Sequence, residues 1–170
     1  FLLNLRGEYH DYFYRHHTGG CTDCCIVTDQ IALIGHNEDG DPEFEDKLYL
    51  VHVQVDDKPA FTALTYPALL CGNALGFNSH GICFSVNNVH PLNNQPGVGR
   101  HFVARSLLEA TSLDDAVARV TTAGQSSGFN YQIGSFPDRR IVNVEVAADK
   151  FSVNKIRGSF FHANHYQSLG

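Results

Sequence analysis

Residues 19–25 read Gly-Gly-Cys-Thr-Asp-Cys-Cys between two strand-like segments, and the peptide bond from Gly20 to Cys21 is the most informative one in this chain. Glycine adopts strained backbone conformations that other residues resist, which suits a peptide bond that is to be broken. The thiol of Cys21 follows directly and can attack the carbonyl carbon of Gly20, so that the acyl group moves from nitrogen to sulfur and water then releases it. The stretch therefore predicts a self-cleaving chain whose product begins at Cys21.

An enzyme that begins at Cys21 carries two reactive groups on one residue. The side chain supplies a thiol nucleophile, and the new α-amine, which titrates near ~8, serves as a base. The alternative interpretation of the same stretch is structural, a tight Gly19-Gly20 turn followed by a buried cysteine. The remaining sequence has to decide between these two interpretations.

The composition indicates a globular domain. A chain of 170 residues fits one domain that buries a core, and 43% hydrophobic with 18% charged residues excludes a disordered chain. No apolar run approaches the ~20 residues that span a bilayer. The net charge is −6 and the sequence has no basic run. We therefore expect neither nucleic acid nor a membrane as a partner.

The chain has five cysteines, at positions 21, 24, 25, 71 and 83. An odd number without a regular framework predicts free thiols in a reducing compartment, so we expect an intracellular, cytoplasmic protein. Cys21-x-x-Cys24 has the spacing of a zinc or redox pair, but the other cysteines form no second pair of that kind. We expect no metal and no cofactor, while His16 and His17 leave a metal site open as an alternative.

The ends of the chain are unusual for a whole protein. It starts in the apolar segment Phe1-Leu-Leu-Asn-Leu5, stops at Gly170 after another strand-like segment, and contains no methionine. We expect an internal piece of a longer sequence, so targeting signals stay open.

The order of the expected elements predicts an α+β fold. Many strands come first, two adjacent helices follow at residues 100–110 and 112–123, and more strands end the chain. Ser112-Leu-Asp-Asp115 is a capping box that opens the second helix. This order indicates a long antiparallel sheet with the helices grouped on one face, and Gly97-Val-Gly99 lacks the context of a phosphate loop. The expected strands cover residues 1–9, 24–28, 31–35, 48–55, 60–66, 74–77, 82–87, 131–136, 141–146, 151–153 and 159–162.

Three polar clusters next to strands supply the parts of an amide hydrolase. They are Cys21 with its glycine, His36-Asn-Glu-Asp39, and His162-Ala-Asn-His165. Asp39 is a candidate to orient the α-amine of Cys21, and Asn164 is a candidate oxyanion donor, an interaction worth ~3–4 kcal/mol. Cysteine–histidine catalysis with His36, His162 or His165 as the base is an open alternative. Taken alone, each cluster is as compatible with a structural role in a turn.

Five sequence blocks give the chain a family resemblance. In order they are Asn4-Leu-Arg-Gly-Glu8, Gly20-Cys-Thr22, Gly35-His-Asn-Glu-Asp39, Gly76-Phe-Asn-Ser-His-Gly81 and His162-Ala-Asn-His165. With these blocks the chain resembles the cysteine N-terminal-nucleophile (Ntn) hydrolases that include acyl-CoA:6-aminopenicillanic acid acyltransferase. Three further segments are more similar to the β-alanyl-amine hydrolases of that family, namely His36-Asn-Glu-Asp-x-x-Pro-Glu43, Phe84-Ser-Val-Asn87 and Arg100-His-Phe.

The resemblance implies a fold and a set of site residues. The fold is a four-layer αββα sandwich, made as an inactive precursor (a zymogen) and cut between Gly20 and Cys21. Residues 1–20 would end the small subunit, and residues 21–170 would belong to the nucleophile-bearing subunit of the same domain, without its C-terminal part. The family's nucleophile, catalytic aspartate and oxyanion asparagine fall on Cys21, Asp39 and Asn164. A second oxyanion or substrate contact falls on Asn87, with Asn88 as the other register.

The expected function is that of a cysteine amidohydrolase working through a thioester acyl-enzyme. By resemblance its substrate is an N-β-alanyl biogenic amine. Expected partners are this small-molecule amide and the chain's own cleaved small subunit, with a homo-oligomer possible. The alternatives are an acyl-CoA-dependent N-acyltransferase using the same residues and a non-processing homologue that serves as a binding or scaffold protein.

Overall fold

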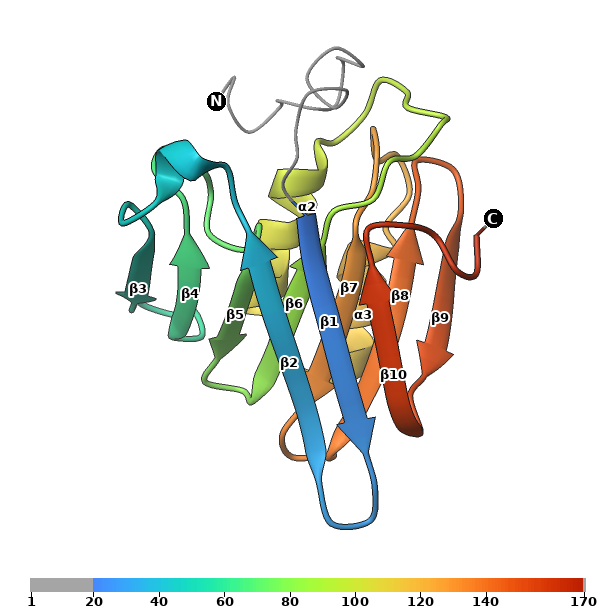
Figure 1. Cartoon of the computed structure of the whole chain (residues 1–170). Helices are drawn as coiled ribbons and strands as arrows, with labels where there is room; N and C mark the ends of the chain where they lie inside the picture. Colours follow the sequence, from blue (N-terminus) through green and yellow to red (C-terminus); the bar gives the residue numbers. More distant parts are fainter. Residues whose placement is uncertain (1–19, 170) are drawn as a thin grey trace.

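A computed structural model describes residues 20–169 of the chain (Figure 1). The predicted strand at residues 1–9, the segment 10–19, and the histidines His16 and His17 lie outside the described residues. All five cysteines lie within them and are free thiols, as expected.

Two antiparallel sheets form most of the described structure. In the smaller sheet, the central strand β1 (Gly20–Val27) pairs with β2 (Ala32–Asp39) on one side and β10 (Gly158–Ala163) on the other. The larger sheet has seven strands in sequence order: β3 (Tyr49–Val53), β4 (Phe61–Thr65), β5 (Leu75–Asn78), β6 (Ile82–Asn87), β7 (Asn130–Ser135), β8 (Arg140–Val146) and β9 (Phe151–Lys155).

The helices lie between β6 and β7 in the chain. They are α2 (Arg100–Ser106), the 3₁₀-helix η3 (Leu107–Glu109) and α3 (Leu113–Val120), and a further 3₁₀-helix, η2 (Pro42–Phe44), follows β2. The side chain of Ser112 accepts a hydrogen bond from the backbone N–H of Asp115 at 3.1 Å, which confirms the predicted capping box. Between residues 20 and 169 the α-helices come one after the other between β6 and β7, which agrees with the predicted grouping of antiparallel strands around one helical block.

Figure 1 shows the described residues as three layers. The smaller sheet stacks on the larger one, with β1 against β6 and β8, and the helices cover the other face of the larger sheet, with α3 against β7 and β8. The mixed fold with many antiparallel strands and few helices agrees with the α+β prediction. The fourth layer of the αββα sandwich stays a prediction.

The main hydrophobic core lies between the seven-stranded sheet and the helices. It includes the fully buried side chains Leu107, Leu108, Val120, Ile133 and Val144. The space between the two sheets is different, because its apolar part is a small cluster around Cys25, Ile141 and Ile156. The rest of that space holds buried polar groups, and the candidate site is built from these.

The structure differs from the prediction at the ends of the first two strands. We expected strands at residues 24–28 and 31–35 with polar residues flanking them, but β1 begins at Gly20 and β2 continues to Asp39. The backbone ladder pairs Gly20 with Asp39 and Cys21 with Glu38. Strand pairing depends on backbone hydrogen bonds, so a polar sequence remains a strand where its side chains find partners across the sheet.

Candidate active site

The first residues of β1 and the last residues of β2 place four polar side chains on one face. Cys21 pairs with Glu38 and Asp23 pairs with His36 across the ladder. Side chains alternate along a strand, so these four face the seven-stranded sheet, whereas Asp39 is on the opposite face. The site thus arises from two short alternating patterns, Cys-x-Asp and His-x-Glu, brought together by one hairpin.

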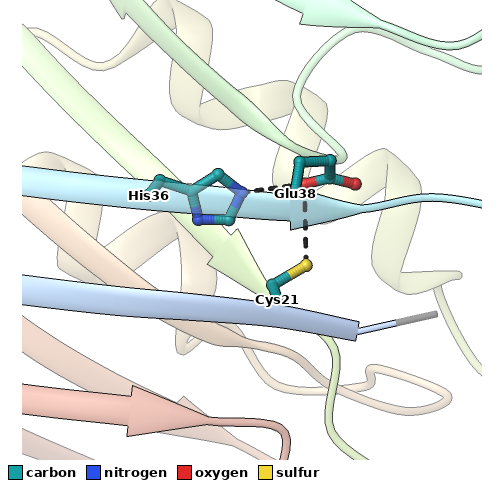
Figure 2. Close-up of side chains that lie close together, drawn as sticks. All are labelled: Cys21, His36 and Glu38. Atoms are coloured by element: carbon teal, nitrogen blue, oxygen red, sulfur yellow. Dashed lines mark hydrogen bonds and ion pairs between the residues drawn. The ribbon is translucent and has the colours of Figure 1, made fainter.

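Glu38 receives hydrogen bonds from three directions (Figure 2). Its Oε2 lies 3.6 Å from Sγ of Cys21 and 2.8 Å from Nε2 of His36. Its Oε1 accepts the hydroxyl of Tyr66 at 2.5 Å. The ring of Tyr66 is in turn fixed by an edge-on contact with Phe44 at 5.1 Å between centroids. The carboxylate is therefore held rigidly beside the sulfur of Cys21.

Asp23 fixes His36 from the other side of the imidazole. This carboxylate is completely buried, and its Oδ1 lies 2.8 Å from Nδ1 of His36. The hydroxyl of Ser85 donates to the same oxygen at 2.7 Å, and Nδ2 of Asn87 donates to Oδ2 at 3.1 Å. A buried carboxylate needs such donors, because leaving it unpaired away from water costs several kcal/mol.

The two carboxylates decide the charge of His36. Burial alone would lower its pKa, but the hydrogen bonds to Asp23, Cys21 and Glu38 outweigh burial and raise the pKa to about 11. His36 is therefore an imidazolium at neutral pH, with a proton on each ring nitrogen. In this state it donates hydrogen bonds and does not accept a proton.

The thiol of Cys21 is protonated at rest. Burial raises its pKa above the ordinary value of a cysteine, and the negative charge of Glu38 acts in the same direction. Hydrogen bonds from His36 and from the backbone N–H of Asn88 to the sulfur lower it again in part. A proton acceptor is consequently needed at the moment when this sulfur attacks a carbonyl carbon.

Asn164 holds the backbone nitrogen of Cys21. Its Oδ1 accepts the Cys21 N–H at 2.9 Å, and its Nδ2 donates to the carbonyl of Asn88 at 2.7 Å. Both partners have fixed roles, so the orientation of this amide is unambiguous. The backbone of Asn164 has φ 36°, in the left-handed region, and its N–H donates to Oδ1 of Asn87 at 2.7 Å. The predicted oxyanion donor thus touches the predicted nucleophile in the uncut chain.

The same contact explains the glycine before Cys21. A Cβ built on Gly20 would lie 2.4 Å from Oδ1 of Asn164, closer than any real contact of that kind. Gly20 is therefore required by the close approach of Asn164.

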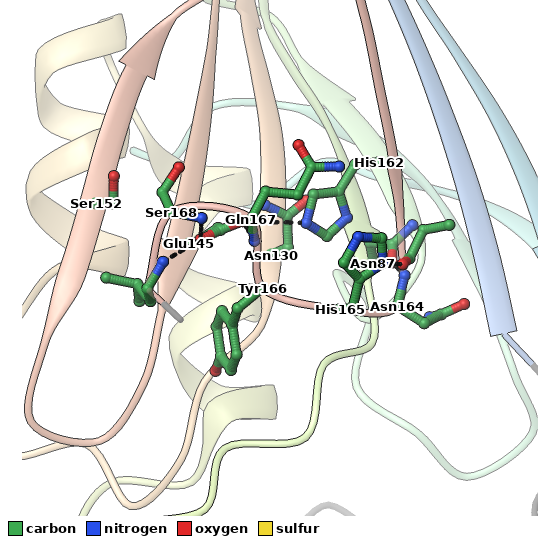
Figure 3. A network of polar contacts seen from close by, with 12 residues as sticks. Asn87, Asn130, Glu145, Ser152, His162, Asn164, His165, Tyr166, Gln167 and Ser168 are labelled. Atoms are coloured by element: carbon green, nitrogen blue, oxygen red, sulfur yellow. Dashed lines mark hydrogen bonds and ion pairs between the residues drawn. The ribbon is translucent and has the colours of Figure 1, made fainter.

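The segment that follows β10 and carries Asn164 is fixed by hydrogen bonds to one buried carboxylate (Figure 3). Glu145, fully buried on β8, accepts the backbone N–H groups of Gln167, Ser168 and Leu169 at 2.6, 2.8 and 3.0 Å. Nε2 of His162 lies 3.3 Å from the same carboxylate. Glu145 therefore ties the segment on both sides of Asn164 to the larger sheet.

A cavity of about 160 Å³ opens beside Cys21 and Glu38. Three of its wall residues have a buried polar atom that finds no hydrogen-bond partner within residues 20–169: Oδ1 of Asn73, Oδ1 of Asn88 and Nδ1 of His101. Burial lowers the pKa of His101 to about 3, so its ring is neutral. These three atoms are therefore available for hydrogen bonds to a polar group of a molecule in the cavity.

The structure brings together Cys21, Asn164 and Asn87 of the predicted site residues. Asn87 lies beneath the site and joins Asp23 to Asn164, whereas Asn88 lines the cavity. Asp39 is exposed opposite Gly20 and accepts a hydrogen bond from Nδ2 of Asn37 at 2.7 Å. The catalytic roles of Asp39 and Asn164 stay predictions.

His36 is the one of the three candidate histidines that lies beside Cys21, within 4.8 Å. His162 contacts Glu145, and His165 contacts the carbonyl of Ala163 and stacks on His162. Asp23, Glu38 and Tyr66 were not predicted as site residues from the sequence. The first two have a signal in the alternation of β1 and β2, but Tyr66 comes from a distant loop and has none.

Cys21 is the second residue of β1, and its sulfur and backbone nitrogen are both held by hydrogen bonds beside a small cavity. The chain belongs to the acyl-coenzyme A:6-aminopenicillanic acid acyl-transferase family, whose sequence model matches residues 27–170. It is also 30% identical over 144 residues to the beta-alanyl-dopamine/carcinine hydrolase of Drosophila melanogaster. These findings confirm the predicted family. The aligned region covers 75% of this chain and 37% of the Drosophila protein.

Within residues 20–169 no helix is long and apolar enough to cross a bilayer.

Gly20→Ala tests the contact with Asn164. The added methyl group must displace Asn164 or the start of β1, so we expect a loss of about 1–3 kcal/mol in the free energy of unfolding, measured by urea denaturation. Gly35→Ala is the matched control on β2, because its Cβ would meet only an ordinary contact at 3.6 Å. Equal destabilisation by the two variants would contradict the proposed reason for Gly20.

Glu145→Gln tests the support of the Asn164 loop. The amide offers one acceptor oxygen where the carboxylate offers two, so a backbone N–H is left unpaired and unfolding should become easier by about 1–3 kcal/mol. The measurement is the urea midpoint at fixed pH. Glu43→Gln, the same change on an exposed residue of η2, should stay within about 0.5 kcal/mol of the wild type. An unchanged midpoint for Glu145→Gln would show that the loop is held by other contacts.

Proposed function

We propose that this chain is the core of a self-cleaving cysteine amidohydrolase that acts on small N-acyl amines. The observation that carries the proposal is the environment of Cys21, whose thiol and backbone nitrogen are both held by side chains at the edge of a small polar cavity. Cleavage of the Gly20–Cys21 bond turns that held nitrogen into an α-amine. The thiol nucleophile and its base then sit on one residue.

The proposed reaction has two steps. Sγ of Cys21 attacks the amide carbonyl of the substrate, the α-amine of Cys21 passes the thiol proton to the leaving amine, and a thioester remains. Water then attacks the thioester and releases the acid. In this proposal Asp39, which pairs with Gly20 at the end of the ladder, orients the α-amine that cleavage leaves on Cys21. Asn164 donates an Nδ2–H to the oxyanion after giving up its bond to the carbonyl of Asn88.

The size and lining of the cavity favour a substrate whose acyl group is short and ends in a positive charge. Its volume of about 160 Å³ is below the ~300–1,000 Å³ of pockets for drug-sized ligands. The carboxylate of Glu38 and the unpartnered oxygens of Asn73 and Asn88 are acceptors for an ammonium group. Arg100 also lines the cavity, and its Nη1 donates to the carbonyls of Val89 and Gly128. Together with the name of the Drosophila relative, this favours an N-β-alanyl amine as substrate.

Acyl transfer is the second candidate activity, because the family model that matches residues 27–170 carries the name of an acyl-transferase. The acyl-enzyme is the same, and an amine takes the place of water in the second step. An acyl-CoA would then be a substrate. A non-processing homologue that only binds ligands is the remaining alternative.

Self-cleavage is tested by the intact mass of the purified protein. We expect two fragments that divide between Gly20 and Cys21, because the thiol needed for the attack is present and held. Cys21→Ala should remain whole, and Cys24→Ala, on the other face of β1, should divide like the wild type. A wild-type chain that stays whole while it turns over substrate would exclude the α-amine as the base.

Substrate class is tested with the cleaved protein. We expect hydrolysis of N-β-alanyl amines to β-alanine and amine, faster than acyl transfer from an acyl-CoA to the same amines.

The rate should rise as pH passes the pKa of the α-amine, roughly 7–8, because only the unprotonated amine accepts a proton. Asp39→Asn should slow turnover and leave the unfolding midpoint unchanged. Absence of both activities in processed protein, or a flat rate from about pH 5 to 9, would contradict this assignment.

A further inference from the structure

The uncut chain lacks the base that the cleaved enzyme is proposed to use. Before cleavage the nitrogen of Cys21 is a peptide amide, and it donates its N–H to Oδ1 of Asn164. An amide nitrogen has no basic lone pair, so it does not take the proton of the thiol. Since burial keeps that thiol protonated, self-cleavage requires another acceptor close to the sulfur.

Among the histidines and carboxylates of the described residues, His36 and Glu38 lie within 4.8 Å of the sulfur. The nearby hydroxyl of Tyr66 donates its proton to a hydrogen bond with Glu38. His36 faces a carboxylate with each ring nitrogen, Nδ1 toward Asp23 and Nε2 toward Glu38, both at 2.8 Å. Such an imidazole is a donor on both sides and has no site left for a proton. Glu38 is a carboxylate whose Oε2 lies 3.6 Å from Sγ of Cys21 and accepts from it.

Glu38 is also the better oriented of the two neighbouring acids. Its side chain is 16% exposed and is fixed by Tyr66 and His36 on its two oxygens. Asp39 follows directly in the chain, but strand alternation turns it to the exposed face of β2. The cavity beside Cys21 and Glu38 leaves the carboxylate reachable by small molecules.

We propose that Glu38 is a catalytic residue of self-cleavage, which accepts the thiol proton of Cys21 while the sulfur attacks the carbonyl carbon of Gly20. The S–H bond breaks, the S–C bond forms, and Oε2 of Glu38 takes the proton. The C–N bond then breaks and the same proton goes to the nitrogen of Cys21, directly or through water. The products are a thioester on Sγ, a free α-amine and the regenerated carboxylate. His36 and Tyr66 are positioning residues. The inference rests on the proposed self-cleavage before Cys21.

Glu38→Gln tests the proposal by the rate at which newly made protein is cut, followed by intact mass. The amide keeps the size of the side chain but takes up no proton, so we expect cleavage to slow by about 100-fold or more. Glu43→Gln, the same change on an exposed acid, should be cut at the wild-type rate. A wild-type chain that is never cut rejects the proposed function itself. A wild type that is cut with Glu38→Gln equally fast rejects only the role of Glu38.

Rescue by an added carboxylate separates chemistry from structure. In Glu38→Ala the cavity gains room for formate, and we expect cleavage to return in proportion to formate concentration, whereas chloride at equal ionic strength should have no effect. A purely structural role would not respond to formate. Glu38→Ala protein with a wild-type unfolding midpoint that formate does not rescue overturns the proposal.

If the Glu38 variants fail to fold, Tyr66→Phe tests whether Glu38 takes part in self-cleavage. It keeps the carboxylate and removes one hydrogen bond from it, so we expect cleavage about tenfold slower than in the wild type. A wild-type rate for Tyr66→Phe, with the Glu38 variants unfolded, overturns the proposal.

Discussion

The buried carboxylate of Asp23 joins the two sheets and organises the site. One of its oxygens accepts hydrogen bonds from His36 and Ser85, and the other accepts a hydrogen bond from Asn87. From the first oxygen a chain of hydrogen bonds runs through His36 and Glu38 to the sulfur of Cys21. From the second it runs through Asn87 and Asn164 to the nitrogen of the same residue. A single buried charge therefore positions both atoms of Cys21 that take part in the proposed chemistry.

This arrangement relates the uncut chain to the enzyme it is proposed to become. Asn164 approaches Gly20 so closely that only glycine fits, and it binds the nitrogen that cleavage would set free. The sulfur already has a carboxylate oxygen at 3.6 Å and lies beside a small cavity. The proposed self-cleavage and the proposed amide hydrolysis are thus the same attack of one sulfur on two different carbonyl groups.

Much of the fold could be predicted from the sequence because its signals are local. Most of the described strands lie where they were expected, and the capping box at Ser112 located the start of α3. Gly20, Cys21 and Asn164 were found as candidates from a glycine before a thiol and from the family blocks. The family itself was predicted from the same blocks and is confirmed by the comparison with known proteins.

The contacts around Cys21 could not be predicted because they depend on register and on distant partners. Neighbouring residues of a strand face opposite sides of the sheet, so a register shift of one residue would exchange Glu38, which faces the sulfur, with Asp39, which faces solvent. Ser85 and Asn87 meet Asp23 across more than sixty residues of chain. Tyr66 reaches Glu38 from the loop after β4, where nothing in the local sequence marks it.

The most direct test of the account is to trap the acyl-enzyme. Processed protein is mixed with an N-β-alanyl amine, quenched in acid during turnover and mapped by peptide mass spectrometry. The account predicts one β-alanyl group in thioester linkage on a peptide whose first residue is Cys21. A β-alanyl group on any other residue, or turnover with no acyl group on this thiol, would contradict it.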